Sequence, residues 1–405
     1  MERRALPGRV HAQDTLHRDR TAGLRPVTSA RVLFVNDHVG HTGGTTYLLN
    51  VLGRLAEFGV QPRLCVLRAP HPVGQELAAL GCEPVFLGRS KWDPMALADL
   101  HRLIGEMRPD ILHLNGMKSH LLGRIAAMRS GVPSIVHLHF EYTPRPAWLQ
   151  RALHRSTDKV LAVSQRLARR AVEQLRIPPS RVEVLHNGLD LRPFRAAGAE
   201  RVAARVALGI GEGRAVICMP GRITFSPDKG HREMVRAMAA IRAAVPDSLL
   251  LIVGEGPDRP ACEALSERLG LSANIRFLGQ SSEIPKLLAA SDIVTIPSMC
   301  QDAFTYVAVE AAAAGRPVVA FRSGGIPEAV REGETGLLVP RGDVAGLAAA
   351  AIGLIEDPSR RAAMGAAAAG FANTFEIDRH VARLAEIYRA LANPAIPPRA
   401  AAAAA

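Results

Sequence analysis

Several features that particular protein classes need are scarce in this chain. Aromatic residues make up only 4% of its 405 residues, which leaves few stacking platforms for single-stranded nucleic acid. No run of about eighteen uninterrupted apolar residues occurs, so the sequence contains no candidate transmembrane helix. The Arg-rich residues 1–30 lack a central apolar segment and do not resemble a secretory signal. We therefore expect a cytoplasmic protein that begins with a disordered basic extension.

Cysteine is also scarce. The five thiols are odd in number, widely spaced, and form no C-x-x-C pair: Cys65, Cys82, Cys218, Cys262 and Cys300. This spacing fits neither a disulfide framework nor a zinc site. The acidic residues show no clustering with metal-ligand spacing either. We expect reduced and mostly buried thiols, no metal site and no cofactor.

Positive charge, in contrast, is abundant. The formal net charge is +12 and the isoelectric point is near 10.2, which raises the question of nucleic-acid binding. The low aromatic content makes a nucleic-acid partner unlikely. An anionic substrate or an anionic membrane surface explains the excess of Lys and Arg better.

Short β-rich apolar runs alternate with helix-periodic stretches, which predicts parallel sheets covered on both faces by helices. The predicted strands are residues 31–36, 63–67, 84–87, 111–115 and 134–139 in the first half, and 215–219, 248–253, 275–278, 293–296 and 317–321 in the second. The alternation pauses over residues 192–213, where charged and small residues dominate. The pattern predicts an α/β protein with two open sheets in tandem.

The predicted organisation follows from this pause. Residues 31–195 form one Rossmann-like domain and 196–373 a second. Residues 374–392 form a C-terminal helix that could pack on either domain, and the Pro- and Ala-rich residues 393–405 form a disordered tail. Ligands of open α/β sheets bind beyond the carboxyl ends of the strands, so we expect a site in a cleft between the domains.

Two cations follow the first predicted strand of the second half. Arg222 and Lys229 lie in the loop GRITFSPDKG, before the next predicted helix. Arg can bind two phosphate oxygens at once and Lys supplies a compact point charge, so the pair suits a diphosphate. The alternative is that both are solvated loop cations.

Two acids, Asp302 and Glu310, flank the start of a helix that we expect near Phe304. Seven residues separate them, and the free N–H groups of the helix N-terminus suit a phosphate. The carboxylates could accept hydrogen bonds from sugar hydroxyls. Asp302 could instead be an ordinary N-cap. Glu310 has apolar neighbours, and burying an acid without a partner is costly.

From about residue 31 to 388 the chain resembles the retaining glycosyltransferases of family 4, which have the GT-B fold of two Rossmann-like domains facing across a cleft. The hallmark of that family is an acid pair at the spacing of Asp302 and Glu310. Further motifs match in order and spacing: HNGLD (186–190), LLLIVGEGP (249–257), NIRFLG (274–279), ASDIVTIPS (290–298), GRPVV (315–319), GGIPE (324–328) and TGLLV (335–339).

The resemblance implies roles for individual residues. Glu310 would bind the ribose and Asp302 the transferred sugar, while Arg222 and Lys229 would bind the diphosphate. Leu278, at the end of residues 275–278, and Ile284 would bracket the nucleobase. Backbone amides would hold phosphate or sugar oxygens at Phe304, Thr305, Tyr306 and Val307.

In the first half, Gly43 and Gly44 resemble the glycine loop that approaches the donor phosphate, where only small residues allow such closeness. His139 aligns with the active-site histidine of the family. A single His at a strand end could equally be a core or capping residue, as His113 and His137 illustrate.

The sequence also departs from the family. Asp302 is one methylene shorter than the usual Glu, and Thr305 and Tyr306 replace a Gly and a smaller residue. The Arg222–Lys229 loop is longer than usual, which makes Lys229 the less certain phosphate ligand. These departures bear on the identity of the donor sugar.

The predicted reaction is transfer of a sugar from a nucleoside diphosphate sugar to an acceptor hydroxyl with retained configuration, in polysaccharide, glycolipid or glycoconjugate synthesis. Arg222, Lys229 and the helix N-terminus would stabilise the departing diphosphate, without a metal. A nucleotide-sugar epimerase of the same fold and a non-catalytic nucleotide-sugar sensor remain alternatives. A phosphorylase would need a pyridoxal lysine, for which we see no support.

One basic segment suggests how an acceptor could be reached. From Arg145 to Arg181 the chain carries nine Lys or Arg residues against two acids. Within it, Trp148, Leu149 and Leu153 share one helical face, as in a peripheral helix at an anionic membrane surface. This would suit a lipid-linked acceptor at the inner face of the membrane. An ordinary surface helix with its apolar side toward the core fits equally well.

Overall fold

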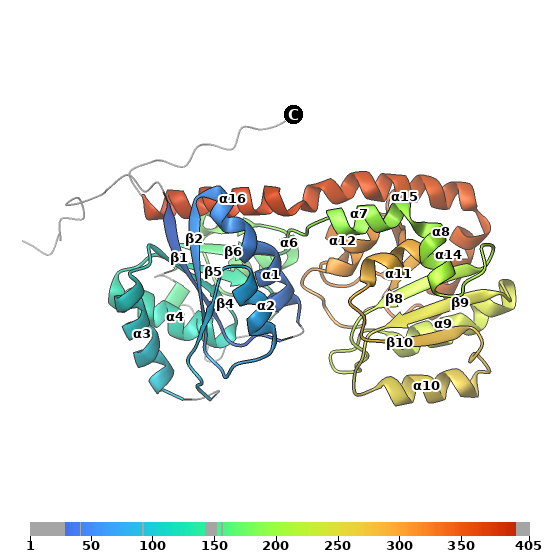
Figure 1. Ribbon diagram of the computed structural model, residues 1–405, viewed down its shortest axis with the longest axis horizontal. Helices are drawn as coiled ribbons and strands as arrows, with labels where there is room; N and C mark the ends of the chain where they lie inside the picture. The colour runs from blue at the N-terminus through green and yellow to red at the C-terminus, as the bar shows by residue number, and fades with distance from the viewer. Residues whose placement is uncertain (1–28, 41, 91–92, 142–151, 155–156, 394–405) are drawn as a thin grey trace, which may run out of the picture.

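The computed structural model describes residues 29–40, 42–90, 93–141, 152–154 and 157–393. These residues form two α/β domains side by side, each with one parallel sheet between layers of helices (Figure 1). The predicted extension over residues 1–30 and the predicted tail over residues 393–405 lie almost entirely outside the described residues. The expected fold class, two Rossmann-like sheets in tandem, is confirmed.

The N-terminal sheet has seven strands in the order β3-β2-β1-β4-β5-β6-β7, all parallel. Its strands are β1 (Ala30–Asn36), β2 (Val60–Val66), β3 (Pro84–Phe86), β4 (Ile111–Asn115), β5 (Ser134–Leu138), β6 (Lys159–Ala162) and β7 (Val182–Val184). Its helices are α1 (Gly43–Leu55), α2 (Val73–Ala79), α3 (Met95–Met107), α4 (Met117–Ser130) and α6 (Gln165–Glu173).

The C-terminal sheet has six parallel strands in the order β10-β9-β8-β11-β12-β13. Its strands are β8 (Ala215–Pro220), β9 (Ser248–Val253), β10 (Ile275–Gly279), β11 (Ile293–Ile296), β12 (Val318–Phe321) and β13 (Gly336–Val339). The helices are α7 (Arg192–Ala199), α8 (Arg201–Ala207), α9 (His231–Ala244), α10 (Arg259–Arg268), α11 (Ile284–Ala290), α12 (Tyr306–Ala313), α13 (Ile326–Ala329), α14 (Val344–Glu356) and α15 (Pro358–Ala372).

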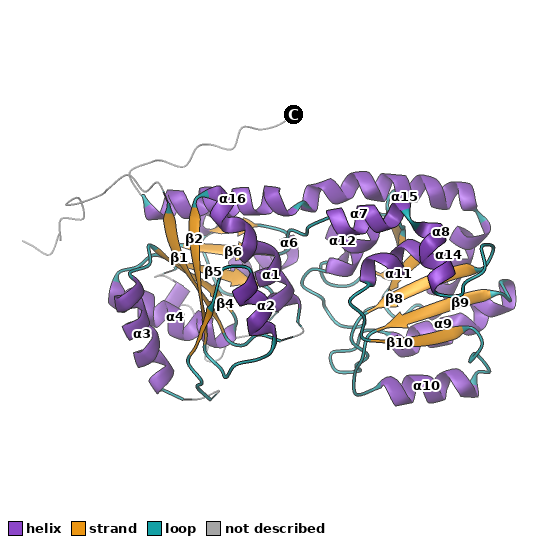
Figure 2. Ribbon diagram, in the orientation of Figure 1, coloured by secondary structure: helices purple, strands orange, loops and turns teal. Residues whose placement is uncertain are grey.

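The central strands are apolar because helices cover both faces of each sheet (Figure 2). Every residue of β9 is buried, as is every residue of β4. Side chains at the helix starts satisfy free N–H groups: the Asp343 carboxylate accepts from Gly346 N at 2.8 Å and the Asp357 carboxylate from Arg360 N at 2.9 Å. Such caps define where helices begin.

The predicted pause over residues 192–213 contains two helices. α7 packs against α11 and α12, and α8 packs against α11, so both belong to the C-terminal domain. The boundary that the sequence placed between residues 195 and 196 falls inside α7, and the chain crosses between the domains before it. The sequence pattern predicted no helix here because charged and small residues dominate it. Arg and Ala nevertheless favour helices, and they form the short helices α7 and α8.

The last helix, α16 (Ile377–Ala392), settles the question of where the C-terminal segment packs. It runs back along the same side of the molecule as α15 and lies on the N-terminal domain (Figure 1). Its apolar residues, among them Val381, Leu384 and Tyr388, join the core formed by α1 and β1. The chain therefore passes twice between the domains. The first crossing is residues 185–191 and the second crossing is residues 373–376.

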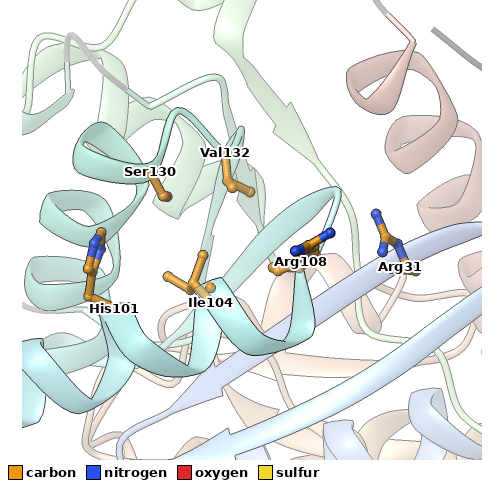
Figure 3. Close-up of a pocket in the computed structure, with 8 residues that line it drawn as sticks. Arg31, His101, Ile104, Arg108, Ser130 and Val132 are labelled. Carbon is orange, nitrogen blue, oxygen red and sulfur yellow. The ribbon is translucent and has the colours of Figure 1, made fainter. Parts of the chain in front are cut away.

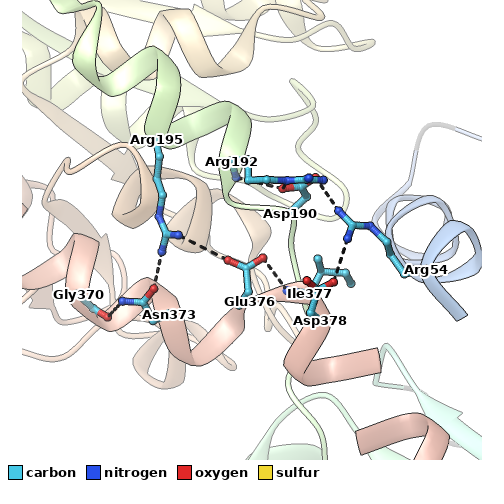
Figure 4. Close-up of polar contacts among 9 residues, drawn as sticks. All are labelled: Arg54, Asp190, Arg192, Arg195, Gly370, Asn373, Glu376, Ile377 and Asp378. Atoms are coloured by element: carbon cyan, nitrogen blue, oxygen red, sulfur yellow. Dashed lines mark hydrogen bonds and ion pairs between the residues drawn. The ribbon is translucent and has the colours of Figure 1, made fainter. Parts of the chain in front are cut away.

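The two crossings are joined by charged side chains. Arg54 of α1 pairs with Asp190 on the first crossing at 3.3 Å and with Asp378 of α16 at 3.0 Å (Figure 4). The first crossing also pairs with the second through its backbone, because Leu189 N donates to Phe375 O at 2.9 Å. These contacts hold the two crossings together.

Candidate functional site

The loop after β8 carries Arg222 to the carboxyl edge of the C-terminal sheet. Glycines of the loop after β9 make this possible: a Cβ on Gly254 would lie 2.1 Å from Gly221 O, and one on Gly256 would lie 2.0 Å from Ile223 O. Only glycine allows such backbone contact. Arg222 itself is exposed, and within the described ranges its guanidinium has no hydrogen-bond or ion-pair partner. It is a permanent cation available to an anionic ligand.

The loop after β8 is also attached to the loop after β11. The Asp228 carbonyl accepts hydrogen bonds from Met299 N at 3.1 Å and Cys300 N at 2.9 Å. Lys229 then forms an ion pair with Asp302, the first acid of the predicted pair. Burial alone would lower the pKa of Lys229, but the Asp302 carboxylate raises it above its ordinary value. The cation and the acid assigned to neighbouring parts of a donor are therefore side by side.

The helix after Asp302 starts later than the sequence predicted. α12 begins at Tyr306 rather than near Phe304, with Thr305 as its N-cap residue in extended conformation. The Thr305 side chain makes no capping hydrogen bond, and no acid lies in the first turn. Among the described residues, the first N–H groups of α12 therefore have no side-chain acceptor, as an anion-binding helix terminus requires.

Phe304 lies at the boundary of the two domains. Its ring packs against the C-terminal core and also against the core of the N-terminal domain around α4 and α6. It lies 5.6 Å from the ring of His186 on the first crossing. Its side chain joins domains, and only its backbone remains a candidate for contact with a ligand.

Glu310 lies in the second turn of α12 among buried alanines. Its carboxylate makes no hydrogen bond or ion pair with the described residues. Burial raises its pKa to about 7. A carboxylate kept in apolar surroundings without a protein partner is costly, and such perturbed groups are concentrated at functional sites.

Leu278 is the last but one residue of β10 and Ile284 starts α11, and both are only partly buried against the C-terminal core. They lie beyond the same edge of the sheet as the loops that carry Arg222 and Asp302. An apolar pair at this edge could flank a flat ring.

The predicted residue of the N-terminal face, His139, follows β5 and belongs to a group of packed rings. Its ring centroid lies 4.0 Å from that of His137 and 4.5 Å from that of Tyr47, and its Nε2 lies 3.2 Å from Asn115 Oδ1. Burial and the neighbouring His380 lower the pKa of His139 to about 3. His139 is therefore neutral at physiological pH and acts as a hydrogen-bonding group.

The sequence analysis missed two residues that contact His139, Asn115 and Tyr47. Asn115 ends β4, and its partner in the register, Asn36, ends β1. Both asparagines lie at the same sheet edge as His139. A polar residue at the end of two neighbouring apolar strands was the available signal. There was no such signal for Tyr47, because a Tyr on the apolar face of α1 is typical of a core residue.

Gly43 and Gly44 begin α1 at the edge of the N-terminal sheet. A Cβ on Gly43 would meet nothing within 4 Å, and neither glycine has a positive φ. The fold therefore does not require glycine at these two positions. This differs from Gly254 and Gly256, where backbone contacts within the chain demand it.

A surface pocket of about 330 Å³ lies elsewhere, between α3 and the start of β1 (Figure 3). Arg31, His101, Arg108 and Ser130 contribute to its lining. It faces the amino ends of the N-terminal strands, opposite the edge that carries His139. Ligands of open parallel sheets bind at the carboxyl ends, so this pocket is separate from the candidate site.

Other predictions meet the described residues only in part. All five cysteines are free, and four of them are buried. Within the described ranges, no group of three or more His, Cys, Asp or Glu residues could hold a metal ion, and none of the helices combines the length and apolar character needed to cross a bilayer. Trp148 and Leu149 of the predicted membrane face lie outside these ranges, whereas Leu153 is 4% exposed.

Comparison with known proteins shows the family to which the chain belongs. Residues 41–192 match the model of Glycosyltransferase Family 4, and residues 201–371 match that of Glycosyl transferases group 1. The chain is 33% identical over 307 residues to the D-inositol 3-phosphate glycosyltransferase of Streptomyces scabiei, covering 69% of this chain and 68% of that protein.

A second relative is the GDP-mannose-dependent alpha-(1-6)-phosphatidylinositol monomannoside mannosyltransferase of Mycolicibacterium smegmatis, 31% identical over 73% of this chain and 80% of that protein. Among solved structures, Anabaena HepE in complex with UDP superposes with a TM-score of 0.79 at 24% identity, covering 88% of this chain and 99% of HepE. Fold, motifs and relatives agree, and the chain belongs to the family 4 glycosyltransferases of GT-B fold.

Proposed function

We propose that this glycosyltransferase moves a sugar from a nucleoside diphosphate sugar to a hydroxyl of a glycan or lipid-linked acceptor, with retention of the anomeric configuration. The observation that carries the proposal is the arrangement at the carboxyl edge of the C-terminal sheet. Three features lie in loops that contact one another: Arg222, which has no partner among the described residues, the Lys229–Asp302 ion pair, and the start of α12, which lacks a side-chain cap from Thr305.

These groups suit a departing diphosphate. Negative charge develops on the leaving group as the bond to the sugar breaks, and fixed cations and helix N–H groups stabilise it without reorganisation. Lys229 would turn from Asp302 toward the phosphate, which leaves the Asp302 carboxylate for sugar hydroxyls. Glu310, whose carboxylate has no partner among the described residues, would accept hydrogen bonds from the ribose. Leu278 and Ile284 would flank the base.

The opposite face would supply the remaining contacts. Gly43 leaves open space in which the backbone can approach the donor phosphates. Neutral His139 would hydrogen-bond the sugar, oriented by Asn115. Proton transfer from the acceptor to the departing phosphate oxygen on one face of the sugar gives retention. This chemistry needs no metal or further cofactor, since protein cations provide the positive charge.

The relatives narrow the acceptors worth testing. One is named for D-inositol 3-phosphate and another for a phosphatidylinositol mannoside, so both a phosphorylated polyol and a lipid-linked glycan belong in the panel. A lipid-linked acceptor would place the enzyme at the cytoplasmic face of a membrane, where the basic segment between Arg145 and Arg181 would contact anionic lipid. The cellular role would be glycolipid, polysaccharide or other glycoconjugate synthesis.

The first test measures donor binding. The melting temperature of the purified protein is recorded with UDP, GDP, ADP and their sugar conjugates, with and without EDTA. Ligand at a hundred times its Kd adds about 2.7 kcal/mol to the unfolding free energy, which is on the order of a few degrees. We expect a shift with one nucleotide that EDTA leaves unchanged. No shift with any nucleotide would contradict the donor site, and a shift that EDTA removes would contradict metal independence.

The second test concerns the reaction. The sugar conjugate that binds is incubated with inositol phosphate and with lipid-linked acceptors, and the anomeric configuration of the product is read by NMR. Transfer with retention is expected. Conversion of the nucleotide sugar into its epimer without any acceptor would support the epimerase alternative instead.

A further inference from the structure

The GGIPE segment contains a residue whose contacts lie in the other domain. Glu328, on the short helix α13 of the C-terminal domain, accepts hydrogen bonds from Gln165 N at 2.7 Å and Arg166 N at 3.2 Å. Both N–H groups belong to the first turn of α6 in the N-terminal domain. Glu328 Oε2 also lies 2.9 Å from His186 Nε2 on the first crossing.

This carboxylate completes the cap of α6. Ser164, the N-cap residue, accepts from Leu167 N at 3.4 Å and leaves the N–H groups of Gln165 and Arg166 to another acceptor. An anion at a helix N-terminus is favoured by both the free N–H groups and the helix dipole. Burial alone would raise the pKa of Glu328, but hydrogen bonds from His186 and from the α6 backbone lower it. The carboxylate is thus ionised where it meets α6.

On its own domain, α13 is attached to the loop that carries Asp302. Gly325 N donates to Asp302 O at 2.6 Å, and Ser323 Oγ donates to Cys300 O at 2.6 Å. A Cβ on Gly324 would lie 2.0 Å from Asp302 O, and one on Gly325 would lie 2.1 Å from Ala303 O. The two backbone segments are in direct contact, so a movement of one displaces the other.

Apolar contacts reinforce the same junction. Ala303 and Phe304 pack against the N-terminal core around α4 and α6, and the Phe304 ring faces that of His186. Residues 300–305, which we name the donor loop, therefore contact the N-terminal domain directly through Phe304 and indirectly through Glu328.

We propose that Glu328 is a positioning residue that fixes the donor loop against α6 and so sets the distance between the sugar held by the C-terminal domain and the groups of the N-terminal face. It touches neither donor nor acceptor. Its effect on catalysis rests on the proposed function, whereas its effect on the junction of the domains does not. The matched comparison residue is Glu334, an exposed acid six positions later whose ion pair, with Arg331 at 3.0 Å, is local.

The test begins with a measurement that needs no substrate. Hydrogen exchange of peptides covering the start of α6 is followed by mass spectrometry in the wild type, Glu328→Gln and Glu334→Gln, together with the radius of gyration from solution scattering. We expect at least fivefold faster exchange at Gln165 and Arg166 and a larger radius of gyration in Glu328→Gln alone. Unchanged exchange and radius in Glu328→Gln would overturn the proposal whether or not the enzyme is active.

Kinetics then separate positioning from general stability. Glu328→Gln should lower kcat at least tenfold while the Kd for UDP or GDP, whichever binds, stays within twofold, and Glu334→Gln should match the wild type. His186→Ala, which removes one of the three contacts, should give a smaller loss in the same direction and serves if Glu328→Gln does not fold. A loss of nucleotide affinity equal to the loss in kcat would overturn the positioning role. If the wild type is inactive but the exchange result is as expected, the proposed function is contradicted. The role of Glu328 in fixing the donor loop against α6 is then still supported.

Discussion

The carboxyl edges of the two sheets differ in the charge of the polar groups that they carry. The C-terminal face presents charge: Arg222 without a partner among the described residues, Lys229 paired with Asp302, and Glu310 with a pKa of about 7. The N-terminal face presents buried neutral rings around His139. Under the proposed function, the charged face would stabilise the departing diphosphate and the neutral face would orient uncharged hydroxyls.

The difference also extends into the interiors of the domains. The N-terminal core contains His113, His120 and His137, all fully buried, and His113 lies within hydrogen-bond distance of Tyr388 Oη, at 2.7 Å, and His137 Nδ1, at 3.1 Å. In the described part of the C-terminal domain, His231 is the one buried histidine. Its core consists otherwise mainly of aliphatic residues and alanine. The two domains should therefore respond differently to acid.

The largest expected effect concerns the charged face. Arg222→Ala removes the exposed cation and should lower kcat by about 10²–10³-fold, the usual loss when one group that stabilises transition-state charge is deleted. Steady-state turnover with the donor found in the binding panel measures it. Arg268→Ala is the matched control, because Arg268 is also exposed and makes no ion pair with the described residues. Equal activity of both variants would remove Arg222 from the donor site.

The next effect concerns the neutral face. Burial lowers the pKa of His139 and His154 to about 3, and that of His380 to about 4. Since these values lie below the unfolded value, the unfolded chain takes up protons first and stability is lost as pH falls below about 6.5. At pH 5 each fully buried neutral ring lowers the free energy of unfolding by up to ~2 kcal/mol.

Hydrogen exchange at pH 7 and pH 5, corrected for intrinsic rates, should therefore show greater loss of protection in the N-terminal domain. The C-terminal domain contains only His231 as a comparable ring among its described residues, with a pKa lowered to about 4 chiefly by burial. Equal loss in both domains would contradict the contrast between their interiors.

The smallest effect is the pH dependence of donor binding. Because the folded pKa of Glu310 is about 7, the carboxylate is mostly protonated at pH 6 and mostly ionised at pH 8. If the ribose hydroxyls donate to the ionised form, affinity for the intact nucleotide sugar should rise about tenfold over this range. Glu310→Gln should bind with an affinity that does not vary with pH. Calorimetry with the sugar conjugate is suitable, because its diphosphate diester does not titrate there.

The structure brings the candidate residues that the sequence predicted in the C-terminal domain to one edge of the sheet, and their role in donor binding stays a prediction. Arg222, Lys229, Asp302 and Glu310 each follow or flank a recognisable apolar strand, and local patterns of that kind are readable. The direct pairing of Lys229 with Asp302 could not be predicted from local patterns, because the two residues lie 73 positions apart. The start of α12 was misplaced by two residues, since Thr305 does not cap it through its side chain.

Contacts between the domains were beyond reach for the same reason. Nothing near Glu328 in the sequence indicates that its partners are N–H groups about 160 residues earlier. The side on which α16 packs was also undetermined, because an amphipathic helix fits any apolar face. Strands β6, β7 and β13 were not predicted, although the equally short β3 and β11 were, so shortness alone does not explain why they were missed.

The return of α16 to the N-terminal domain has a consequence for biosynthesis. Tyr388 is fully buried beside Phe34 and His113, so the core of the N-terminal domain contains residues that are synthesised after the whole C-terminal sheet. Domains generally fold as units while the chain is being synthesised. Here the N-terminal domain cannot complete its apolar core until the C-terminal domain has been synthesised and α16 has packed back onto it.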